Sequence, residues 1–440
     1  MRAVISLLKL EPRARWFFAV LTQSALGTGA AHVALLLIAL QRFESPWAVS
    51  LVLLADMVPT MLLGPILGAA ADRWPRKLCA VVGDLLRLVA FLGIAIANPF
   101  AATVAFAVLA GVGNALFKPA VLSALPSLVA PERAAAATSL YGSITDVGFT
   151  VGPVITAGAL LLIEPEGIMF VNALTFGASA VILWRLAWGT SVGDEAAGAA
   201  RTSLLHEARL GLREALRMPG LRTVIAATAG IVFVAGLFNV AEPLFATDTI
   251  DVGGSGFALL VASFGTGFVV GSLRGAAGGD PPILRRRYLQ GLFLGGIGFL
   301  ATGVAPGLLA AVLTFGLAGF GNGLMLVHER VLFNRVVPDH LQGRMFAVSD
   351  TAASWAFGLS YLCAGPLISA LGVRETILIA GGAALGVAVL ATLGLRSHWR
   401  VMVRPNLGQG RFVRADGVEA APPLPDEDQA SLAAPSRSRS

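Results

Sequence analysis

The chain has 440 residues, of which 56% are hydrophobic and only 13% are charged, and its formal net charge is +6. Soluble domains carry about 25% charged residues, so this composition excludes an ordinary water-soluble protein and predicts an all-α membrane protein with many spans. The two cysteines provide no disulfide framework. The five histidines are too scattered to form a metal site, so no metal is expected.

Apolar runs long enough to cross a bilayer recur along the whole chain, and short polar loops separate them. We predict twelve transmembrane helices, at residues 16–40, 47–71, 78–97, 101–125, 134–163, 168–188, 223–246, 257–277, 288–305, 307–333, 345–371 and 376–395. Between the sixth and seventh spans, apolar residues and arginines of 203–218 fall on different helical faces, which predicts an amphipathic helix on the membrane surface. The tail from residue 396 is rich in Pro, Ser, Ala and charge and is predicted to be disordered.

Basic residues are distributed unequally between the two sides of this layout. The loops on the side of the chain termini carry most of the arginines and lysines, whereas the opposite loops carry only Arg42 and Arg374. Positive charge marks the cytoplasmic side, so we expect a multi-pass protein of the inner (cytoplasmic) membrane with both termini in the cytoplasm. These bases set the topology and meet anionic lipids, and we expect no nucleic-acid partner.

An internal repeat divides the chain into two halves. Gly111-Val-Gly113-Asn114 recurs as Gly319-Phe-Gly321-Asn322, and each is followed by a proline-containing loop and by a Gly-Pro pair, Gly152-Pro153 or Gly365-Pro366, in the next span. Parallel repeats of six spans are typical of one class of transporter. The expected organisation is a cytoplasmic N-terminus (1–15), an N-terminal six-helix bundle (16–188), a cytoplasmic linker (189–222), a C-terminal six-helix bundle (223–395) and a cytoplasmic tail (396–440).

A short loop after the second span carries the most specific motif, formed by Gly68, Asp72, Arg73, Arg76 and Lys77. It resembles the signature loop of the major facilitator superfamily, although Pro occupies position 75, where a Gly is common. The resemblance implies two pseudo-symmetric six-helix bundles. It also implies that this loop latches the outward-open state, because its acid faces the start of the eleventh span. The alternative is that these bases only set the topology.

Other short sequence segments resemble one branch of that superfamily. The fifth predicted span contains Gly148, Gly152, Pro153 and Gly158, which resemble the antiporter motif of drug exporters. Residues 117–129, together with Gly343-Arg344, resemble macrolide-efflux and enterobactin-exporter-like proteins. Asp350 lies one to two turns into the eleventh span and could pair with Arg73 or Arg76.

Several acids fall inside the predicted spans, where an unpaired charge costs roughly 2.5–3.5 kcal/mol on insertion scales. Asp56 and Asp146 lie near mid-depth in the second and fifth spans, with no base beside them in the sequence. Both are candidate proton carriers, and the alternative is a structural acid that accepts hydrogen bonds at a bent helix. Asp84 and Arg87 are three residues apart and therefore face each other on one helix as a structural pair.

Further polar residues are candidates for gates or for a central substrate cavity. Glu242 lies near the outer end of the seventh span, either gating the outer mouth and selecting cations or resting among lipid headgroups. Glu329 and Arg330 lie near the inner end of the tenth span and are expected to help close the cytoplasmic side. The residues expected to face the cavity are Gln23, His32, Asn114 and Asn322. His32 could equally be a hydrogen-bonded filler.

Absent motifs narrow the function. No Gly-Lys pair exists, so a Walker phosphate-binding loop is impossible, and no serine nucleophile elbow is present. We therefore expect no enzyme and no cofactor. The resemblance implies a monomeric secondary active antiporter that uses the proton motive force to export an amphiphilic small molecule, such as a macrolide drug or a siderophore. The alternatives are an importer or facilitator of the same fold and a non-transporting receptor or scaffold.

Overall fold

The computed structural model describes residues 12–71, 74–186, 213, 217–275, 281–337, 339–402, 412–413 and 419–420. Some helical residues, including residues 64–71 and Asp146, are described by their backbone alone. Most of the predicted amphipathic helix at 203–218 and two residues of the signature loop, Asp72 and Arg73, lie outside the described residues.

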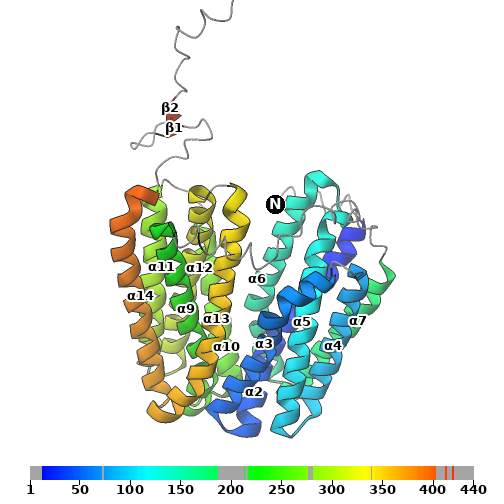
Figure 1. Ribbon diagram of the computed structural model, residues 1–440. Coiled ribbons are helices and arrows are strands. Elements are labelled where there is room, and N and C mark those ends of the chain that lie inside the picture. Colours follow the sequence, from blue (N-terminus) through cyan, green and yellow to red (C-terminus); the bar gives the residue numbers. More distant parts are fainter. Residues whose placement is uncertain are drawn as a thin grey trace, which may run out of the picture.

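Long helices account for almost all of the described chain (Figure 1). The N-terminal half contains α2 (Pro12–Phe43), α3 (Pro46–Ala71), α4 (Arg76–Ile96), α5 (Phe100–Leu128), a 3₁₀ turn (Pro131–Arg133), α6 (Ala134–Ala159) and α7 (Pro165–Arg185). The C-terminal half contains α9 (Pro219–Leu244), a π-helical turn (Phe245–Thr249), α10 (Gly253–Gly275), α11 (Pro281–Gly303), α12 (Leu308–Val336), α13 (Asp339–Leu371) and α14 (Val373–Met402). Two short strands, β1 (Phe412–Val413) and β2 (Glu419–Ala420), pair antiparallel in the tail.

Ten helices in the described part of the chain are apolar and long enough to cross a membrane. The two remaining long helices, α6 and α11, are less apolar because α6 contains Ser, Thr and Asp146 and α11 begins with Arg285 to Arg287. Both still have the length to span, since 26 and 23 residues extend about 39 and 35 Å at 1.5 Å per residue. They stand alongside the other helices in both bundles (Figure 1).

The two halves repeat one packing pattern. In the N-terminal half α2 packs against α6 and α7, α5 against α3 and α4, and α4 against α7. In the C-terminal half α9 packs against α13 and α14, α12 against α10 and α11, and α11 against α14. The repeated glycines explain the closest of these contacts. A Cβ at Gly113 would lie 2.8 Å from the carbonyl oxygen of Gly83, and a Cβ at Gly321 would lie 2.7 Å from that of Gly291.

The halves meet through α3 against α13 and α6 against α10. We call the end of the bundle where α2 begins and α14 finishes the terminal end, and the other the opposite end. Close approaches between halves occur at the opposite end, where Gly365 faces Trp47 and Gly254 faces Leu37. One apolar core joins residues of both halves, whereas the core at the terminal end of the N-terminal half contains residues of that half alone. The ribbons accordingly diverge toward the terminal end (Figure 1).

A guanidinium ties three helices of the N-terminal half together at the opposite end. Arg42, near the end of α2, donates hydrogen bonds to the carbonyl oxygens of Ile94, Ala95 and Ala97 at the end of α4, at 2.5–2.8 Å. It also forms a 3.0 Å ion pair with Glu166 in the first turn of α7. The carbonyl oxygens in the last turn of a helix have no N–H donor within that helix. The Arg42 guanidinium supplies the missing donors at the end of α4.

Most helix boundaries differ from the predicted ones by a few residues, and three of the differences have a clear physical reason. The helix α6 ends at Ala159 rather than 163 because the chain turns through residues 160–164 ahead of Pro165. The helix α11 begins at Pro281 rather than 288, since proline suits a first helical turn and the arginines that follow tolerate a helix outside the apolar layer. The helix α14 continues to Met402, beyond the predicted start of the disordered tail.

Candidate functional site

Asp56 lies on α3, the helix that packs against α13 of the other half. The residue is half-buried, and its carboxyl group interacts electrostatically with Arg87 of α4 and with Tyr361 of α13. The hydroxyl of Tyr361 accepts a 3.2 Å hydrogen bond from Nδ2 of Asn239 on α9. The structure therefore places this predicted proton carrier in a polar group that reaches both halves, a connection that sequence spacing cannot show.

The glycines of the predicted antiporter motif line the contact between α6 and α2. A Cβ at Gly148 would lie 2.6 Å from the carbonyl oxygen of Ala25, and Gly152 packs equally closely against α2. Pro153 is buried in the same helix. Gly158 differs, because it is exposed and a Cβ there would meet nothing within 4 Å. Gly148 and Gly152 therefore belong to this packed interface.

A side-chain hydrogen bond reinforces the same contact. Oγ1 of Thr156 on α6 donates to the carbonyl oxygen of Ala30 on α2 at 3.0 Å. The side chain of Asp146, the second predicted proton carrier, lies outside the described residues, although its backbone belongs to α6.

The described bases of the signature loop bind helix ends in their own half. Arg76 donates to the carbonyl oxygen of Ser123 on α5 at 2.9 Å, and Lys77 donates to that of Leu186 after α7 at 3.0 Å. Asp350 is exposed on α13, and in the described part of the chain no ion pair joins it to Arg76. Arg73, the other base with which Asp350 could pair, lies outside the described residues, so that pairing stays a prediction. Gly68 lies within α3, and its contacts are outside the description.

Asp84 and Arg87 form the structural pair predicted from their spacing. Their side chains make a direct ion pair on α4, and Asp84 is fully buried. Its second oxygen accepts a 2.5 Å hydrogen bond from Ser179 on α7. The Arg87 guanidinium lies over the rings of Phe117 and Phe176, 4.0 and 4.3 Å from their centroids, an arrangement that favours a cation. Both charges are therefore held in place from several helices.

Glu329, which is expected to help close the cytoplasmic side, is buried within α12, where it is 5% exposed. Its Oε1 accepts a 3.3 Å hydrogen bond from Ser349 on α13, and its Oε2 has no partner among the described residues. The adjacent His328 is fully buried with Nδ1 2.6 Å from the carbonyl oxygen of Leu324, while its Nε2 is unpartnered in the described structure. Arg330, by contrast, is exposed.

Glu242 lies near the opposite end of α9 and is only 4% exposed, so it does not rest among lipid headgroups. Its Oε1 has no hydrogen-bond partner in the described part of the chain. Pro243 follows it, and the backbone then forms the π-helical turn Phe245–Thr249. Such turns are rare and recur at functional sites.

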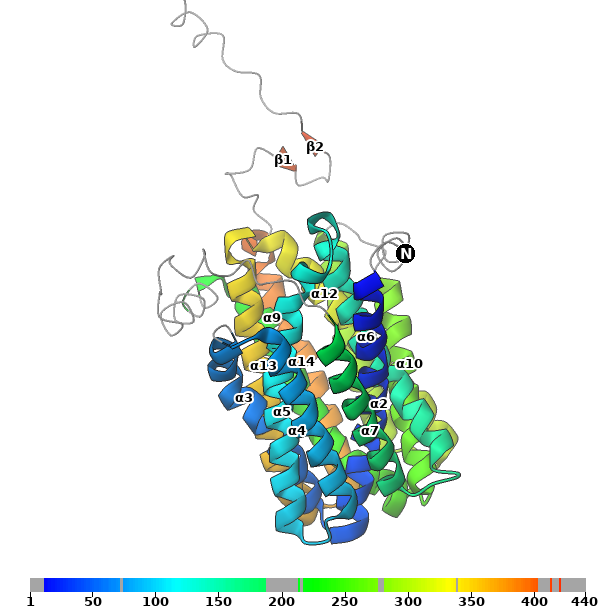
Figure 2. The same ribbon diagram turned by 90° about the vertical axis from the view of Figure 1, so that its right-hand side faces the viewer.

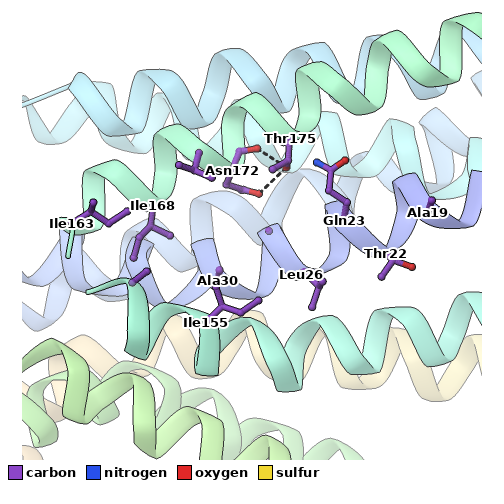
Figure 3. A pocket seen from close by; sticks show the side chains of 13 residues that line it. Ala19, Thr22, Gln23, Leu26, Ala30, Ile155, Ile163, Ile168, Asn172 and Thr175 are labelled. Atoms are coloured by element: carbon purple, nitrogen blue, oxygen red, sulfur yellow. Dashed lines mark hydrogen bonds between the residues drawn. The ribbon is translucent and has the colours of Figure 1, made fainter. Parts of the chain in front are cut away.

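The residues expected to face a central cavity do not share one environment. Gln23 lines a pocket of about 590 Å³ between α2, α6 and α7, within the N-terminal half, rather than a cavity between the halves (Figure 3). The His32 ring packs edge-on against Phe149 of α6, with 6.3 Å between centroids. Asn114 is exposed on α5, whereas Asn322 is half-buried on α12. The side of a helix that each residue occupies depends on helix packing, which residue spacing alone does not fix.

Comparisons with known proteins agree on one family. Residues 17–355 match the model of the Major Facilitator Superfamily. The multidrug efflux pump Tap of Mycolicibacterium fortuitum is 30% identical over 82% of this chain and 90% of its own length. Macrolide efflux protein A of Streptococcus pyogenes is 20% identical over 80% of this chain and 88% of its own length.

A solved structure shares the fold. A bacterial homologue of the human lysosomal transporter Spinster, in an inward-facing and unoccupied conformation, has a TM-score of 0.69 to this chain. It covers 90% of this chain with 99% of its own and is 15% identical in sequence.

Proposed function

Because the chain belongs to the major facilitator superfamily, we propose that it is a proton-coupled antiporter that exports an amphiphilic small molecule. Membership makes the protein a multi-pass membrane transporter of a small-molecule substrate rather than an enzyme. The substrate class follows the efflux proteins to which the chain is similar: a drug such as a macrolide, or a siderophore. We further propose that it works as a monomer in the inner membrane, with both termini in the cytoplasm.

The position of Asp56 is the observation that best supports proton coupling. Its carboxyl group interacts electrostatically with Tyr361 across the contact between α3 and α13. Tyr361 in turn binds Asn239 of α9. Binding or release of a proton on Asp56 changes a charge at the surface where the two halves move against each other. A proton can therefore bias one arrangement of the halves over the other.

The remaining predicted residues take supporting roles in this proposal. Asp146 is a second carrier on α6, which faces α10 of the other half. The signature loop, with Asp72 and Arg73, engages α13 when the terminal end closes. No bound cofactor is needed, since the proton motive force drives the cycle.

The test is substrate-driven proton movement in everted membrane vesicles. Macrolides and siderophores are added one at a time, and dissipation of an imposed pH gradient is followed by a pH-sensitive dye. Asp56→Asn and Asp146→Asn are expected to reduce this flux while the protein inserts normally. Asp251→Asn is the matched control, because Asp251 is an exposed loop acid with a positive φ of 51°, a conformation that Asn tolerates. Full flux in both span variants would reject these residues as carriers.

The same preparation decides the direction of transport. Everted vesicles should accumulate the exported compound when their interior is acidic, because protons that leave drive the compound inward, and they should not when the gradient is reversed. Accumulation only when the exterior is acidic would instead identify a proton-coupled importer.

A further inference from the structure

Two arginines line a pocket in the C-terminal half that has no part in the proposed transport cycle. The pocket has a volume of about 450 Å³, within the range of roughly 300–1,000 Å³ for small-molecule sites. Its polar lining residues are Arg274 of α10 with Arg287 and Gln290 of α11, and its other lining residues are apolar. None of the described residues that line it is acidic, so the pocket favours an anionic ligand.

The pocket exists because α10 and α11 both pack closely on α12. A Cβ at Gly271 of α10 would lie 2.1 Å from the carbonyl oxygen of Phe320 on α12. A Cβ at Gly291 of α11 would lie 2.6 Å from the backbone nitrogen of Met325 on α12. In the described part of the chain, α10 and α11 scarcely contact each other. The pocket is therefore a crevice between α10 and α11, with α12 as its floor.

This crevice faces away from the N-terminal half. Figure 2 shows α6 and α10 next to each other, and a Cβ at Gly265 of α10 would lie 2.9 Å from Cα of Thr150 on α6. Arg274 follows Gly265 by nine residues, about two and a half turns, so the two lie on opposite sides of α10. Val270, one turn before Arg274, and Ile297, one turn beyond the pocket on α11, are 47% and 46% exposed. In a membrane, these apolar side chains meet lipid.

The charged and the apolar parts of the lining lie at different depths. Arg274 is in the last turn of α10 and Arg287 is the seventh residue of α11, so both are near the terminal end of the bundle. Leu294 lines the pocket seven residues further along α11, about 10 Å deeper at 1.5 Å per residue. One leaflet of the hydrocarbon layer is about 15 Å thick. The lining therefore suits a ligand with an anionic group at the membrane surface and an apolar chain below it.

The sequence around the crevice is also basic. Residues 274–287 contain four arginines and a single acid, Asp280, which gives them a net charge of +3. Basic pockets between membrane helices bind the headgroups of anionic lipids. A guanidinium group can donate two parallel hydrogen bonds to the oxygens of one phosphate.

We propose that this crevice binds an anionic phospholipid of the leaflet at the terminal end of the bundle. The lipid phosphate accepts hydrogen bonds from the guanidinium groups of Arg274 and Arg287. Gln290, which is less than one turn deeper than Arg287, meets the glycerol region, and one acyl chain runs inward against Leu294 and Phe320. This site is independent of the proposed export activity.

The experiment uses the full chain in phosphatidylcholine nanodiscs that contain a trace of phosphatidylglycerol with a photoreactive diazirine in one acyl chain. After irradiation, labelled peptides are identified by mass spectrometry. Labelling should include the segment of α12 around Phe320. Unlabelled phosphatidylglycerol should compete with the probe, whereas inorganic phosphate should not. A diazirine probe with a phosphatidylcholine headgroup should label this segment only weakly.

Three variants that each lower the net charge by one separate binding in the crevice from general attraction. Arg274→Gln should lower the labelling of α12 about fivefold, the effect of one base near an anionic lipid surface. Gln290→Glu should lower it as well, because it places a negative charge below the phosphate. Arg286→Gln is the matched control and should leave labelling unchanged, since Arg286 is exposed on α11 and does not line the pocket.

Several outcomes would overturn the proposal. Equal labelling by the two headgroups would show that the charge is not recognised, and competition by inorganic phosphate would show that the site does not need a lipid. Equal labelling in Arg274→Gln and Arg286→Gln, or full labelling in Gln290→Glu, would place the probe outside the crevice. Displacement by a transported compound would assign the crevice to the substrate. Loss of transport with labelling intact would reject the proposed function alone.

Discussion

The two halves of the molecule bury carboxyl groups near the terminal end in opposite ways. Asp84 in the N-terminal half has a cationic partner and a second hydrogen bond. Glu329 in the C-terminal half accepts one long hydrogen bond from Ser349, interacts with Thr228 and with the exposed Arg330, and forms no ion pair among the described residues. Breaking a buried pair is costly because it leaves the other charge alone, whereas an unpaired buried carboxyl group is cheapest when neutral. The comparison teaches that burial alone does not decide the charge state of a carboxyl group, because the cations and hydrogen-bond donors around it also matter.

Removal of the counter-charge should have the largest effect on stability. Arg87→Leu leaves Asp84 buried without a cation, so the free energy of unfolding should fall by about 3–5 kcal/mol. Thermal unfolding of the detergent-purified protein measures this loss. Combining Arg87→Leu with Asp84→Leu should recover most of it, because neither charge then remains. A double variant no more stable than Arg87→Leu would mean that packing, not charge, dominates this site.

Ser179→Ala should cause the next largest loss of stability. It removes the 2.5 Å hydrogen bond to Asp84, and hydrogen bonds to charged groups contribute about 1.5–3 kcal/mol. The same unfolding assay, with Ser143→Ala on α6 as an exposed control, checks this value. A loss equal to that of the control would show that Arg87 alone satisfies the Asp84 carboxylate.

Glu329→Leu should change stability much less than Arg87→Leu. The substitution removes a buried oxygen that has no hydrogen-bond partner, but it also removes the acceptor of the Ser349 hydroxyl, so the free energy of unfolding should change by no more than about 1 kcal/mol. If Glu329 exchanges a proton during transport, this stable variant should also lose efflux driven by a pH gradient. Everted vesicles measure the flux. A large loss of stability would show that Glu329 has a counter-charge and would remove the contrast between the halves.

Ser349→Ala should have the smallest effect. Its hydrogen bond to Glu329 is long, at 3.3 Å, and a neutral hydrogen bond contributes about 0.5–1.5 kcal/mol. We expect a loss in the lower part of that range, measured beside Ser179→Ala. Equal losses from the two serines would indicate that Glu329 is charged in the folded protein.

Sequence reasoning was most successful where the controlling interactions are local. The lengths of the apolar segments predict the all-α membrane fold, and the short motifs indicate the superfamily. The ion pair of Asp84 with Arg87 followed from a three-residue spacing on one helix. The start of α11 was misplaced because its three arginines look like a loop, although a helix can continue past the apolar layer.

Side-chain environments set by neighbouring helices could not be predicted in this way. Gln23 faces α7 rather than the other half because α2 is rotated to pack between α6 and α7. Glu242 is buried although its sequence position suggests the membrane surface. Glu329 and Arg330 are adjacent in the sequence and share one expected role, yet the two side chains have opposite exposures.

The bonds of Arg42 have a consequence for how the molecule moves. Helix ends normally fray first, but here one side chain joins the end of α2 to the end of α4 and the start of α7. The backbone amides around Ile94 should therefore exchange hydrogen slowly for a helix terminus. We expect α2, α4 and α7 to keep their relative positions at this end, so that a change of angle between the halves is taken up where Gly365 meets α3 and Gly265 meets α6.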